Sequence, residues 1–197
     1  MELPFSQACE NNKGPILALL HQYLGDRRHV FEVGAGTGQH AAYFAEQLPH
    51  LIWQCADRGP YLEGLNARIA LTDLPNLPAA IAFDMAAPQW PAGHDAVYTA
   101  NTLHIMSEAL ALELLRQAGR SLPPGGLALV YGPFKYRGQF FGPINGAFDA
   151  RLRVENHASG IRDQEDVVQA AGEGGLELIE DCALPANNQL LVFRKTG

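Results

Sequence analysis

The sequence lacks paired cysteines. Its 197 residues contain three, Cys9, Cys55 and Cys182, an odd number at widely separated positions and without a Cys-x-x-Cys pair. Redox dithiols and zinc sites use closely spaced cysteines, so the pattern argues against both kinds of site. Isolated thiols are typical of a reducing compartment, and we therefore expect a cytoplasmic protein.

Long hydrophobic runs are also missing. The longest segment without a formally charged residue is Ser121–Phe134, and it contains Pro-Pro-Gly-Gly. A membrane-spanning helix needs about 20 mainly apolar residues. The chain begins with the polar, acidic MELPFSQACENNKGP, whereas a secretory signal has a basic start and an apolar run. We therefore expect no membrane segment and no signal peptide.

Positive charge is scarce. There are 14 Lys and Arg residues against 21 Asp and Glu, which gives a formal net charge of −7. A polyanion would meet an unfavourable overall field, so the balance argues against a nucleic-acid partner, although Phe134-Lys-Tyr-Arg137 alone resembles a base-stacking surface. The seven histidines show no metal-ligand spacing such as His-x-x-x-His, and we expect no metal site.

What the sequence does contain is a regular alternation of predicted strands and helices. The hydrophobic share of 47% suffices for a core, and the length favours a single domain over residues 1–197. Strands are predicted at 29–33, 51–56, 79–83, 96–100, 127–131, 176–179 and 190–193. Ser107 and Asp163 are placed to cap two of the helices. Apolar strands that alternate with helices predict an α/β fold, with a doubly wound, mostly parallel seven-stranded sheet.

Two segments lie outside this alternation. Residues 1–28 form a predicted N-terminal cap and helix, with Pro15 in the first helical turn and apolar residues following at helical spacing. Residues 133–160 are rich in aromatic residues, Gly and Pro, and are too long for a routine connection. We expect this insertion to form an aromatic lid, because long self-packed loops often close over binding sites.

A glycine-rich turn, Gly34-Ala-Gly-Thr-Gly38, joins the first predicted strand to the next helix. Turns of this kind let the backbone approach a ligand at the carboxyl ends of the strands. Gln39 stands where the dinucleotide fingerprint has its third glycine, which weakens a nicotinamide or flavin interpretation. Glu32 precedes the turn, and its carboxylate would repel a pyrophosphate but balance a cationic ligand.

These residues resemble the first motif of class I S-adenosylmethionine-dependent methyltransferases, a family with a Rossmann-like fold. The resemblance implies that Glu32 meets the amino-acid end of the cofactor, Asp57 its ribose, and Asp84 with Met85 its adenine. The remaining residues of the implied cofactor site are Gly34, Ala35, Gly36, Gly38 and Asn101. The turn Leu122-Pro-Pro-Gly-Gly126 also fits the family.

A closer resemblance covers nearly the entire length. The chain is similar to the domain of unknown function 938 family, which includes methyltransferase-like protein 26, in the segments FSQACENNKGPIL, GTGQHAAYFA, NTLHIM, YGPF, FDARLR, GIRDQEDV and LPANNQLLVF. This family implies the fold and the cofactor but supplies no established substrate.

Two side chains are candidates for a catalytic base. His104 follows the fourth predicted strand, and an imidazole with an unperturbed pKa of about 6.5 suits proton transfer from a hydroxyl or amine. The alternative is that His104 only binds backbone beside the next helix. Tyr131 is the second candidate. The predicted acceptor-binding residues are Asn12, His40, Phe134, Asn187 and Asn188, with His40 neutral because the helix N-terminus disfavours imidazolium.

The predicted function is S-adenosylmethionine-dependent methyl transfer to a small molecule through an oxygen, nitrogen or sulfur nucleophile. One alternative is a non-catalytic protein that binds S-adenosylmethionine or S-adenosylhomocysteine, or a scaffold of the same fold. A nicotinamide oxidoreductase is a second alternative. The acceptor and the oligomeric state are not determined by the sequence.

Overall fold

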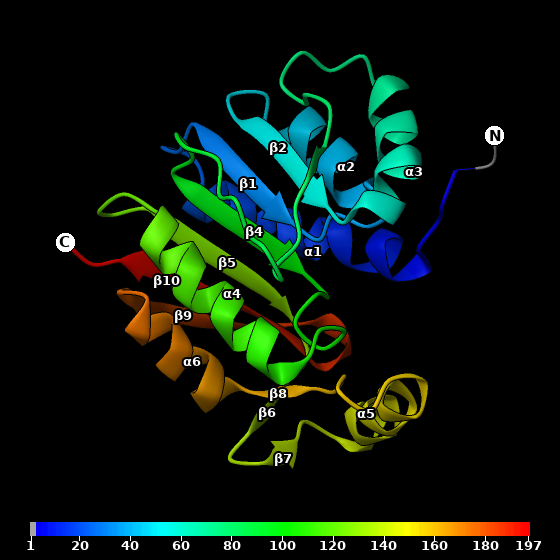
Figure 1. Ribbon diagram of the computed structural model, residues 1–197, viewed down its shortest axis with the longest axis vertical. Helices are drawn as coiled ribbons and strands as arrows, with labels where there is room; N and C mark the ends of the chain where they lie inside the picture. Colours follow the sequence, from blue (N-terminus) through cyan, green and yellow to red (C-terminus); the bar gives the residue numbers. More distant parts are fainter. Residues whose placement is uncertain (1–2) are drawn as a thin grey trace. The chain divides into compact units, whose positions relative to one another are not determined.

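The computed structural model describes residues 3–197, and residues 1 and 2 of the predicted N-terminal segment lie outside the described residues (Figure 1). The chain divides into two compact units, Met1–Tyr98 and Thr99–Gly197. The single domain predicted over residues 1–197 therefore stays a prediction.

Seven strands form one sheet in the order β3-β2-β1-β4-β5-β10-β9. They are β1 (His29–Val33), β2 (Ile52–Asp57), β3 (Ile81–Ala82), β4 (Ala96–Ala100), β5 (Leu127–Gly132), β9 (Leu176–Leu184) and β10 (Asn188–Lys195). The strand β1 runs parallel to β2 and β4, and β2 runs parallel to β3. The strand β10 is antiparallel to both β5 and β9. The predicted α/β fold with a mostly parallel seven-stranded sheet is confirmed.

Three helices belong to the first unit. They are α1 (Gln7–Tyr23), α2 (Gln39–Gln47) and α3 (Gly59–Ala70). Helix α1 packs on α2, α2 packs on α3, and both α2 and α3 lie against β2 (Figure 1). The predicted start of the first helix at Pro15 is wrong, because the Ser6 hydroxyl accepts a hydrogen bond from the Cys9 N–H at 3.4 Å and caps a helix that begins two turns earlier.

Aromatic side chains fill the core of the first unit. Phe44, Trp53 and Tyr98 contact one another with ring centroids 5.4 to 5.7 Å apart. All three are buried. Tilted and edge-to-face pairs of this kind add about 0.5–1.5 kcal/mol each beyond area burial. The aromatic cluster therefore fixes α2 against β2, and with it the glycine-rich turn that precedes α2.

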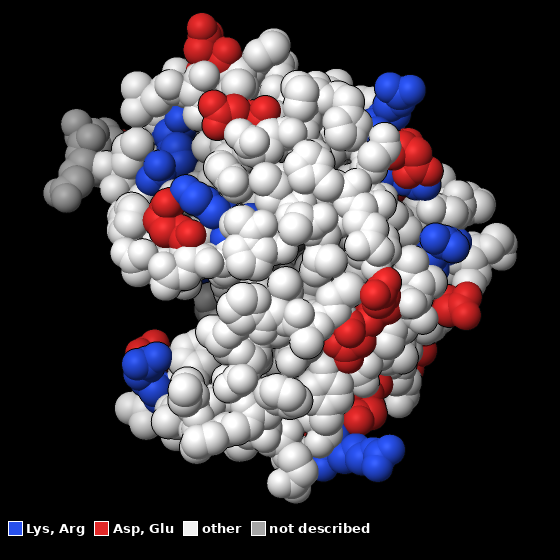
Figure 2. All heavy atoms as spheres, turned by 180° about the vertical axis from the view of Figure 1, so that it is seen from behind, with Lys and Arg blue, Asp and Glu red and all other residues white. Residues whose placement is uncertain are grey.

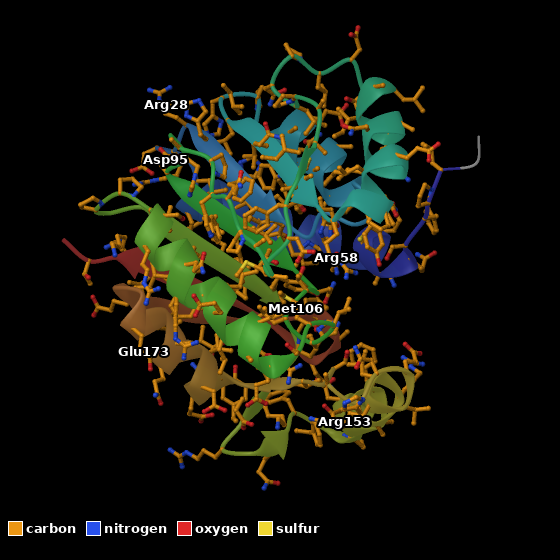
Figure 3. All side chains as sticks on the ribbon, viewed as in Figure 1. Arg28, Arg58, Asp95, Met106, Arg153 and Glu173 are labelled. Carbon is orange, nitrogen blue, oxygen red and sulfur yellow. The ribbon has the colours of Figure 1, made fainter. Side chains whose placement is uncertain are left out.

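The amino ends of β1 and β4 are tied together at one edge of the first unit. Asp95 directly precedes β4, and its Oδ1 accepts hydrogen bonds from the N–H groups of Arg28 at 3.1 Å and His29 at 2.9 Å. Figure 3 labels Arg28 and Asp95 at this edge. The carboxyl ends of these parallel strands lie at the opposite edge, where α/β sheets bind ligands.

The second unit contains α4 (Glu108–Ser121), α5 (Pro143–Glu155), α6 (Gln164–Glu173) and the short 3-10 helix Pro185–Asn187. Ser107 caps α4 as predicted, since its hydroxyl accepts from the Leu110 N–H at 3.4 Å. Helix α4 packs closely on α6, and the absence of a side chain at Gly119 allows this approach. A Cβ added there would lie 2.5 Å from the Gly174 carbonyl oxygen. A side chain at Gly119 would force these segments apart.

The predicted lid, residues 133–160, is folded rather than a loop. It contains β6 (Phe134–Tyr136), β7 (Gln139–Phe140) and α5, and β6 joins β7 and β8 (Arg162–Asp163) in a small second sheet. Asp163 stands at the start of α6, but the predicted capping by its side chain is wrong. Its carboxylate instead pairs with Lys135 Nζ at 2.8 Å and accepts from the Gly138 N–H at 2.7 Å.

Charges of both signs are interspersed on the face shown in Figure 2, with uncharged surface between them. That face therefore carries no extended basic patch. In the part of the chain that the structure describes, no helix combines the length and apolar character needed to span a membrane.

Candidate functional site

The glycine-rich turn between β1 and α2 is closed by backbone hydrogen bonds. The N–H groups of Gly34 and Ala35 donate to the Ala56 carbonyl oxygen at 2.9 and 3.2 Å. The Gly38 N–H donates to the Ala35 carbonyl oxygen at 2.9 Å. The end of β2 therefore holds the turn in place.

Asp57 completes this closure from the last position of β2. Its Oδ2 accepts a hydrogen bond from the Gly36 N–H at 2.7 Å, and its Oδ1 accepts from the Arg58 N–H at 2.7 Å. Each carboxylate oxygen keeps a second lone pair for a ligand donor. Phosphate-binding turns present free N–H groups, whereas four N–H groups of this turn already have protein acceptors. The turn is therefore poorly suited to a pyrophosphate.

The middle glycine of the turn borders open space. A Cβ added to Gly36, which has a φ of +55°, would have no described heavy atom within 4 Å. A Cβ added to Gly38 would instead lie 2.6 Å from Leu65 Cδ1, so Gly38 is needed for packing. The Asp57 carboxylate is bonded to the Gly36 N–H beside this space, and ribose hydroxyls, which are uncharged donors, fit its acceptor oxygens. The residues present thus fit S-adenosylmethionine.

Glu32 is buried inside β1, with 2% of its surface exposed. Its Oε2 accepts a hydrogen bond from Trp53 Nε1 at 2.6 Å. Burial raises the pKa of the Glu32 carboxyl to about 7; the Trp53 hydrogen bond opposes this rise, and the negative charge of Asp57 adds to it. A nearby cation would favour the ionised carboxylate.

Asp84 and Met85 follow β3 at the same edge as Asp57. The Phe83 N–H donates to the Asp57 carbonyl oxygen at 2.9 Å, which joins the ends of β2 and β3. Asp84 is exposed, and its Oδ1 accepts from the Ala86 N–H at 2.9 Å. Met85 is buried. The structure therefore brings Asp57, Asp84 and the glycine turn to one edge.

Asn12 and His40, both predicted to bind the acceptor, are hydrogen-bonded to each other. Asn12 Oδ1 lies 2.6 Å from His40 Nε2, and the His40 ring stacks on Phe44 with centroids 5.1 Å apart. Burial lowers the pKa of His40 to about 4. The imidazole is therefore neutral at pH 7. The sequence predicts a neutral His40 from its position at a helix N-terminus, whereas in the structure the main cause is burial.

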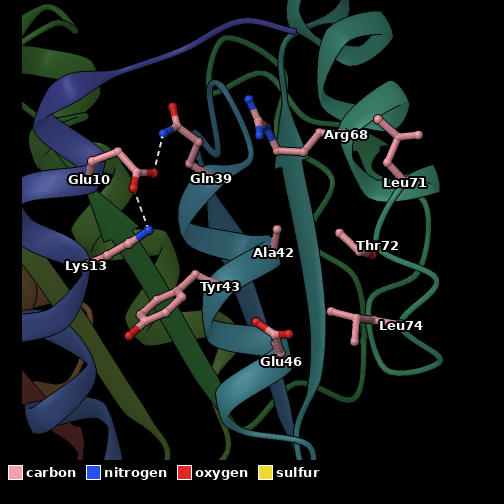
Figure 4. A pocket seen from close by; sticks show the side chains of 10 residues that line it. All are labelled: Glu10, Lys13, Gln39, Ala42, Tyr43, Glu46, Arg68, Leu71, Thr72 and Leu74. Carbon is pink, nitrogen blue, oxygen red and sulfur yellow. Dashed lines mark hydrogen bonds and ion pairs between the residues drawn. The ribbon is translucent and has the colours of Figure 1, made fainter.

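A groove of about 420 Å³ lies over the outward side of α2 (Figure 4). Glu10 lies at one end, where its carboxylate accepts from Gln39 Nε2 at 2.6 Å and pairs with Lys13 at 2.5 Å. These bonds from Lys13 and Gln39 lower the pKa of Glu10. No residue predicted to bind the cofactor or the acceptor lines this groove. Gln39, which lines the groove, bonds to Glu10 and so ties the N-terminal helix to the start of α2.

His104 is buried in the second unit, in the loop between β4 and α4, with 6% of its surface exposed. Its ring makes an edge contact with Phe148, with centroids 5.2 Å apart. Burial lowers the pKa of His104 to about 4, and the positive charge of Arg162 acts in the same direction. At pH 7 the imidazole is therefore neutral and can accept a proton, although it is a weak base.

Arg162 holds the backbone of the His104 loop. It is 4% exposed, and its guanidinium donates to the carbonyl oxygens of Leu103 at 3.2 Å and Met106 at 2.6 Å. The Gly160 N–H donates to the His104 carbonyl oxygen at 2.9 Å. Figure 3 labels Met106 in this loop. The segment that follows α5 thus fixes the loop that carries the candidate base.

The structure does not bring Tyr131 and His104 to the same face of the sheet. A Cβ on Gly132 would lie 3.9 Å from His104 Nδ1, and Tyr131 is the neighbouring strand residue, whose side chain points to the other face. The Tyr131 carbonyl oxygen accepts from the N–H of Asn101, which has a φ of +55°. Tyr131 therefore contributes backbone to the start of the His104 loop.

The remaining predicted acceptor residues differ in exposure. Phe134 is fully buried in β6. Asn187, at the end of the short 3-10 helix, and Asn188, the first residue of β10, are half-buried. The Asn187 carbonyl oxygen accepts from Asn145 Nδ2 at 3.2 Å, which links this turn to α5. The structure therefore associates the Asn187 turn with the insertion.

Sequence reasoning missed Trp53 and Arg162. Trp53 lies near the start of β2, and its contact with Glu32 depends on how β1 and β2 pair. Arg162 lies 56 positions from its acceptor Met106. Its local sequence, Gly-Ile-Arg-Asp-Gln-Glu-Asp, is typical of a polar segment before a helix and gives no signal that the guanidinium is buried. Within residues 3–197, no three His, Cys, Asp or Glu residues group in a way that could hold a metal ion.

A family model described as a protein of unknown function (DUF938) matches residues 3–195. Aclacinomycin 10-hydroxylase RdmB of Streptomyces purpurascens is 30% identical over 176 residues, which are 84% of this chain and 46% of that protein. The 3-hydroxy-5-methyl-1-naphthoate 3-O-methyltransferase of Streptomyces sahachiroi is 30% identical over 103 residues, 52% of this chain and 30% of that protein. The chain spans less than half the length of these relatives.

Solved structures match over a larger share of the chain. The S-adenosylmethionine-dependent methyltransferase SibL has a TM-score of 0.81 at 26% identity, covering 96% of this chain and 56% of that one. Human N-acetylserotonin methyltransferase in complex with S-adenosylmethionine has a TM-score of 0.83 at 15% identity, covering 97% and 53%. The chain therefore has the class I methyltransferase fold and is distantly homologous to S-adenosylmethionine-dependent methyltransferases.

Proposed function

Because this chain belongs to the family described as a protein of unknown function (DUF938), we propose its function from its own site: S-adenosylmethionine-dependent methylation of a small molecule. The observation that carries the proposal is the glycine turn beside Asp57. Its N–H groups are engaged, open space adjoins Gly36, and the nearby side chains are acidic. This combination favours a cationic nucleoside over a pyrophosphate.

In this proposal each acid has a separate role. Glu32 balances the positive charge of the cofactor, and Asp57 accepts hydrogen bonds from the ribose hydroxyls. Asp84 and Met85 contact the adenine. Gly34, Ala35, Gly36, Gly38 and Asn101 provide the remaining cofactor contacts. When bound, S-adenosylmethionine would supply an activated methyl group on a sulfonium, whose leaving group is a neutral thioether.

The protein's own contribution is then alignment, exclusion of water and removal of a proton. His104 is the proposed base, because its neutral imidazole faces the space beside Gly132. Tyr131 is a weaker candidate, since its side chain points to the other face of the sheet. Asn12, His40, Phe134, Asn187 and Asn188 remain the proposed acceptor-binding residues. A cytoplasmic location belongs to the same proposal and rests on the cysteine pattern.

The names of the relatives support a small-molecule acceptor. One curated relative is named as a 3-O-methyltransferase of a naphthoate. Another is named as a hydroxylase, so the fold alone does not fix the reaction. That second name supports the alternative in which this chain binds S-adenosylmethionine or S-adenosylhomocysteine without transferring a methyl group.

Calorimetry with S-adenosylmethionine, S-adenosylhomocysteine and NAD tests the cofactor. We expect the first two to bind at sub-millimolar concentration and NAD not to bind. Gly36→Ala should abolish binding of S-adenosylmethionine, because the added alanine methyl group would occupy the open space beside Gly36 that we propose for the cofactor. Gly93→Ala is a matched control, since Gly93 has a φ of +91° and no described atom within 4 Å of its added Cβ. Binding of NAD alone would overturn the proposal.

A further inference from the structure

A buried acceptor without a donor lies near the start of β10. Gln189 is 3% exposed, and its Oε1 has no hydrogen-bond partner among the described residues. A buried, unpaired amide oxygen costs stability, because it gives up water without a replacement. Such an atom in a folded protein calls for an explanation, and a donor on a bound molecule is one.

The register of the sheet fixes the side on which Gln189 lies. Gln189 stands opposite Gly132 in the antiparallel pair of β10 and β5. Side chains of directly opposed residues share one face of a sheet, with Cβ atoms about 4.5–5.5 Å apart. The Gln189 side chain and the missing side chain of Gly132 are therefore on the same face.

His104 lies on this face too. Its Nδ1 is 3.9 Å from the position that a Gly132 Cβ would occupy, and beyond the chain neighbours of Gly132 no other described heavy atom comes within 4 Å of that position. Gly132 therefore leaves room on a face of the sheet that also carries the neutral His104 imidazole and the Gln189 side chain with its unpartnered amide oxygen. The three residues all belong to the second unit.

We infer that Gln189 is an acceptor-binding residue, and that with His104 it selects molecules bearing two neighbouring hydrogen-bond donors. One donor is the hydroxyl that faces His104, and the second, on an adjacent atom, donates to Gln189 Oε1. The inference deepens and rests on the proposed function, because it names the class of acceptor. A vicinal dihydroxy compound fits this class, whereas a monohydroxy compound leaves Gln189 unpaired.

Calorimetric titration with catechol and phenol tests the inference, with and without saturating S-adenosylhomocysteine. We expect catechol to bind about tenfold or more tightly than phenol, since the missing hydroxyl leaves a buried acceptor unpaired. Gln189→Leu should reduce this ratio to about threefold or less. Gln117→Leu is a matched control on α4, outside the proposed site, and should keep the native ratio.

Unfolding by urea separates this role from a structural one. Gln189→Leu removes an unpaired buried polar atom and keeps a similar volume, so its urea midpoint should equal or exceed that of the native protein. A lower midpoint would show that Gln189 holds the fold. Equal binding of the two probes, no binding of either, or an unchanged ratio in Gln189→Leu would also overturn the inference. Failure of S-adenosylhomocysteine to bind would count against the cofactor proposal, and the probe ratio would still decide the role of Gln189.

Discussion

Replacing Glu32 with glutamine should stabilise the protein above pH 7. The Glu32 carboxyl is buried, its Oε2 accepts from Trp53 Nε1, and its pKa is raised from 4.5 to about 7. A glutamine oxygen can accept the same hydrogen bond without the charge. Since one pKa unit corresponds to 1.36 kcal/mol, ionising this carboxyl in the folded protein costs about 3 kcal/mol relative to the unfolded chain.

The sign of the pH dependence follows from the raised pKa. The folded protein holds the Glu32 proton more tightly than the unfolded chain, so the stability from this group is fully present below pH 4.5 and declines until about pH 7. Glutamine has no proton to lose. The free energy of unfolding of Glu32→Gln should therefore exceed that of the native protein by about 1 kcal/mol or less at pH 5 and by about 3 kcal/mol at pH 8.

Urea unfolding of both proteins at pH 5, 6, 7 and 8 measures this difference, because the other titrating groups affect both proteins alike. A difference that does not change with pH, or a variant less stable at pH 8, would refute the reasoning. The proposed function adds a further consequence. A cation near Glu32 lowers its pKa, so S-adenosylmethionine should bind more tightly as pH rises from 6 to 8 in the native protein but not in Glu32→Gln.

Three further substitutions test separate parts of the account. Asp57→Ala removes the acceptor of the Gly36 N–H and the proposed ribose contact. Calorimetry should show S-adenosylmethionine binding weakened by about 1–3 kcal/mol, and an unchanged affinity would make Asp57 purely structural. Gly38→Ala forces a methyl group to 2.6 Å from a leucine side chain, so urea unfolding should show a loss of about 1–3 kcal/mol, and wild-type stability would disprove this contact. Arg162→Leu leaves the carbonyl oxygens of Leu103 and Met106 unpaired and should cost about 3–5 kcal/mol. Arg162 Nη1 also pairs with the exposed Glu108 Oε2 at 3.4 Å, and Glu108→Ala should cost only about 0–1 kcal/mol; similar losses would contradict the assignment.

The sheet and its glycine turn could be predicted because their signals are local. Apolar strands alternate with helices at regular spacing, and Gly34–Gly38 sits directly between one strand and one helix. Ser107 was also predictable, since a helix cap involves residues three positions apart. The start of α1 was not, because Pro15 suggests a helix start more strongly than Ser6 does.

The partners of the buried polar groups could not be predicted, because they depend on strand register and on distant segments. Trp53 meets Glu32 only through the pairing of β1 with β2. Gln189 shares a face of the sheet with Gly132 only through the register of β10 with β5. Its side chain would lie on the other face if the register shifted by one residue.

Transfer of an isotopically labelled methyl group tests the central claim most directly. The protein would be incubated with S-adenosylmethionine carrying the label and with a panel of small hydroxylated molecules, and the products analysed by mass spectrometry. We predict that label appears on an acceptor oxygen in equal amount with S-adenosylhomocysteine. Saturating binding of S-adenosylmethionine without label on any acceptor would contradict the account and support the non-catalytic alternative.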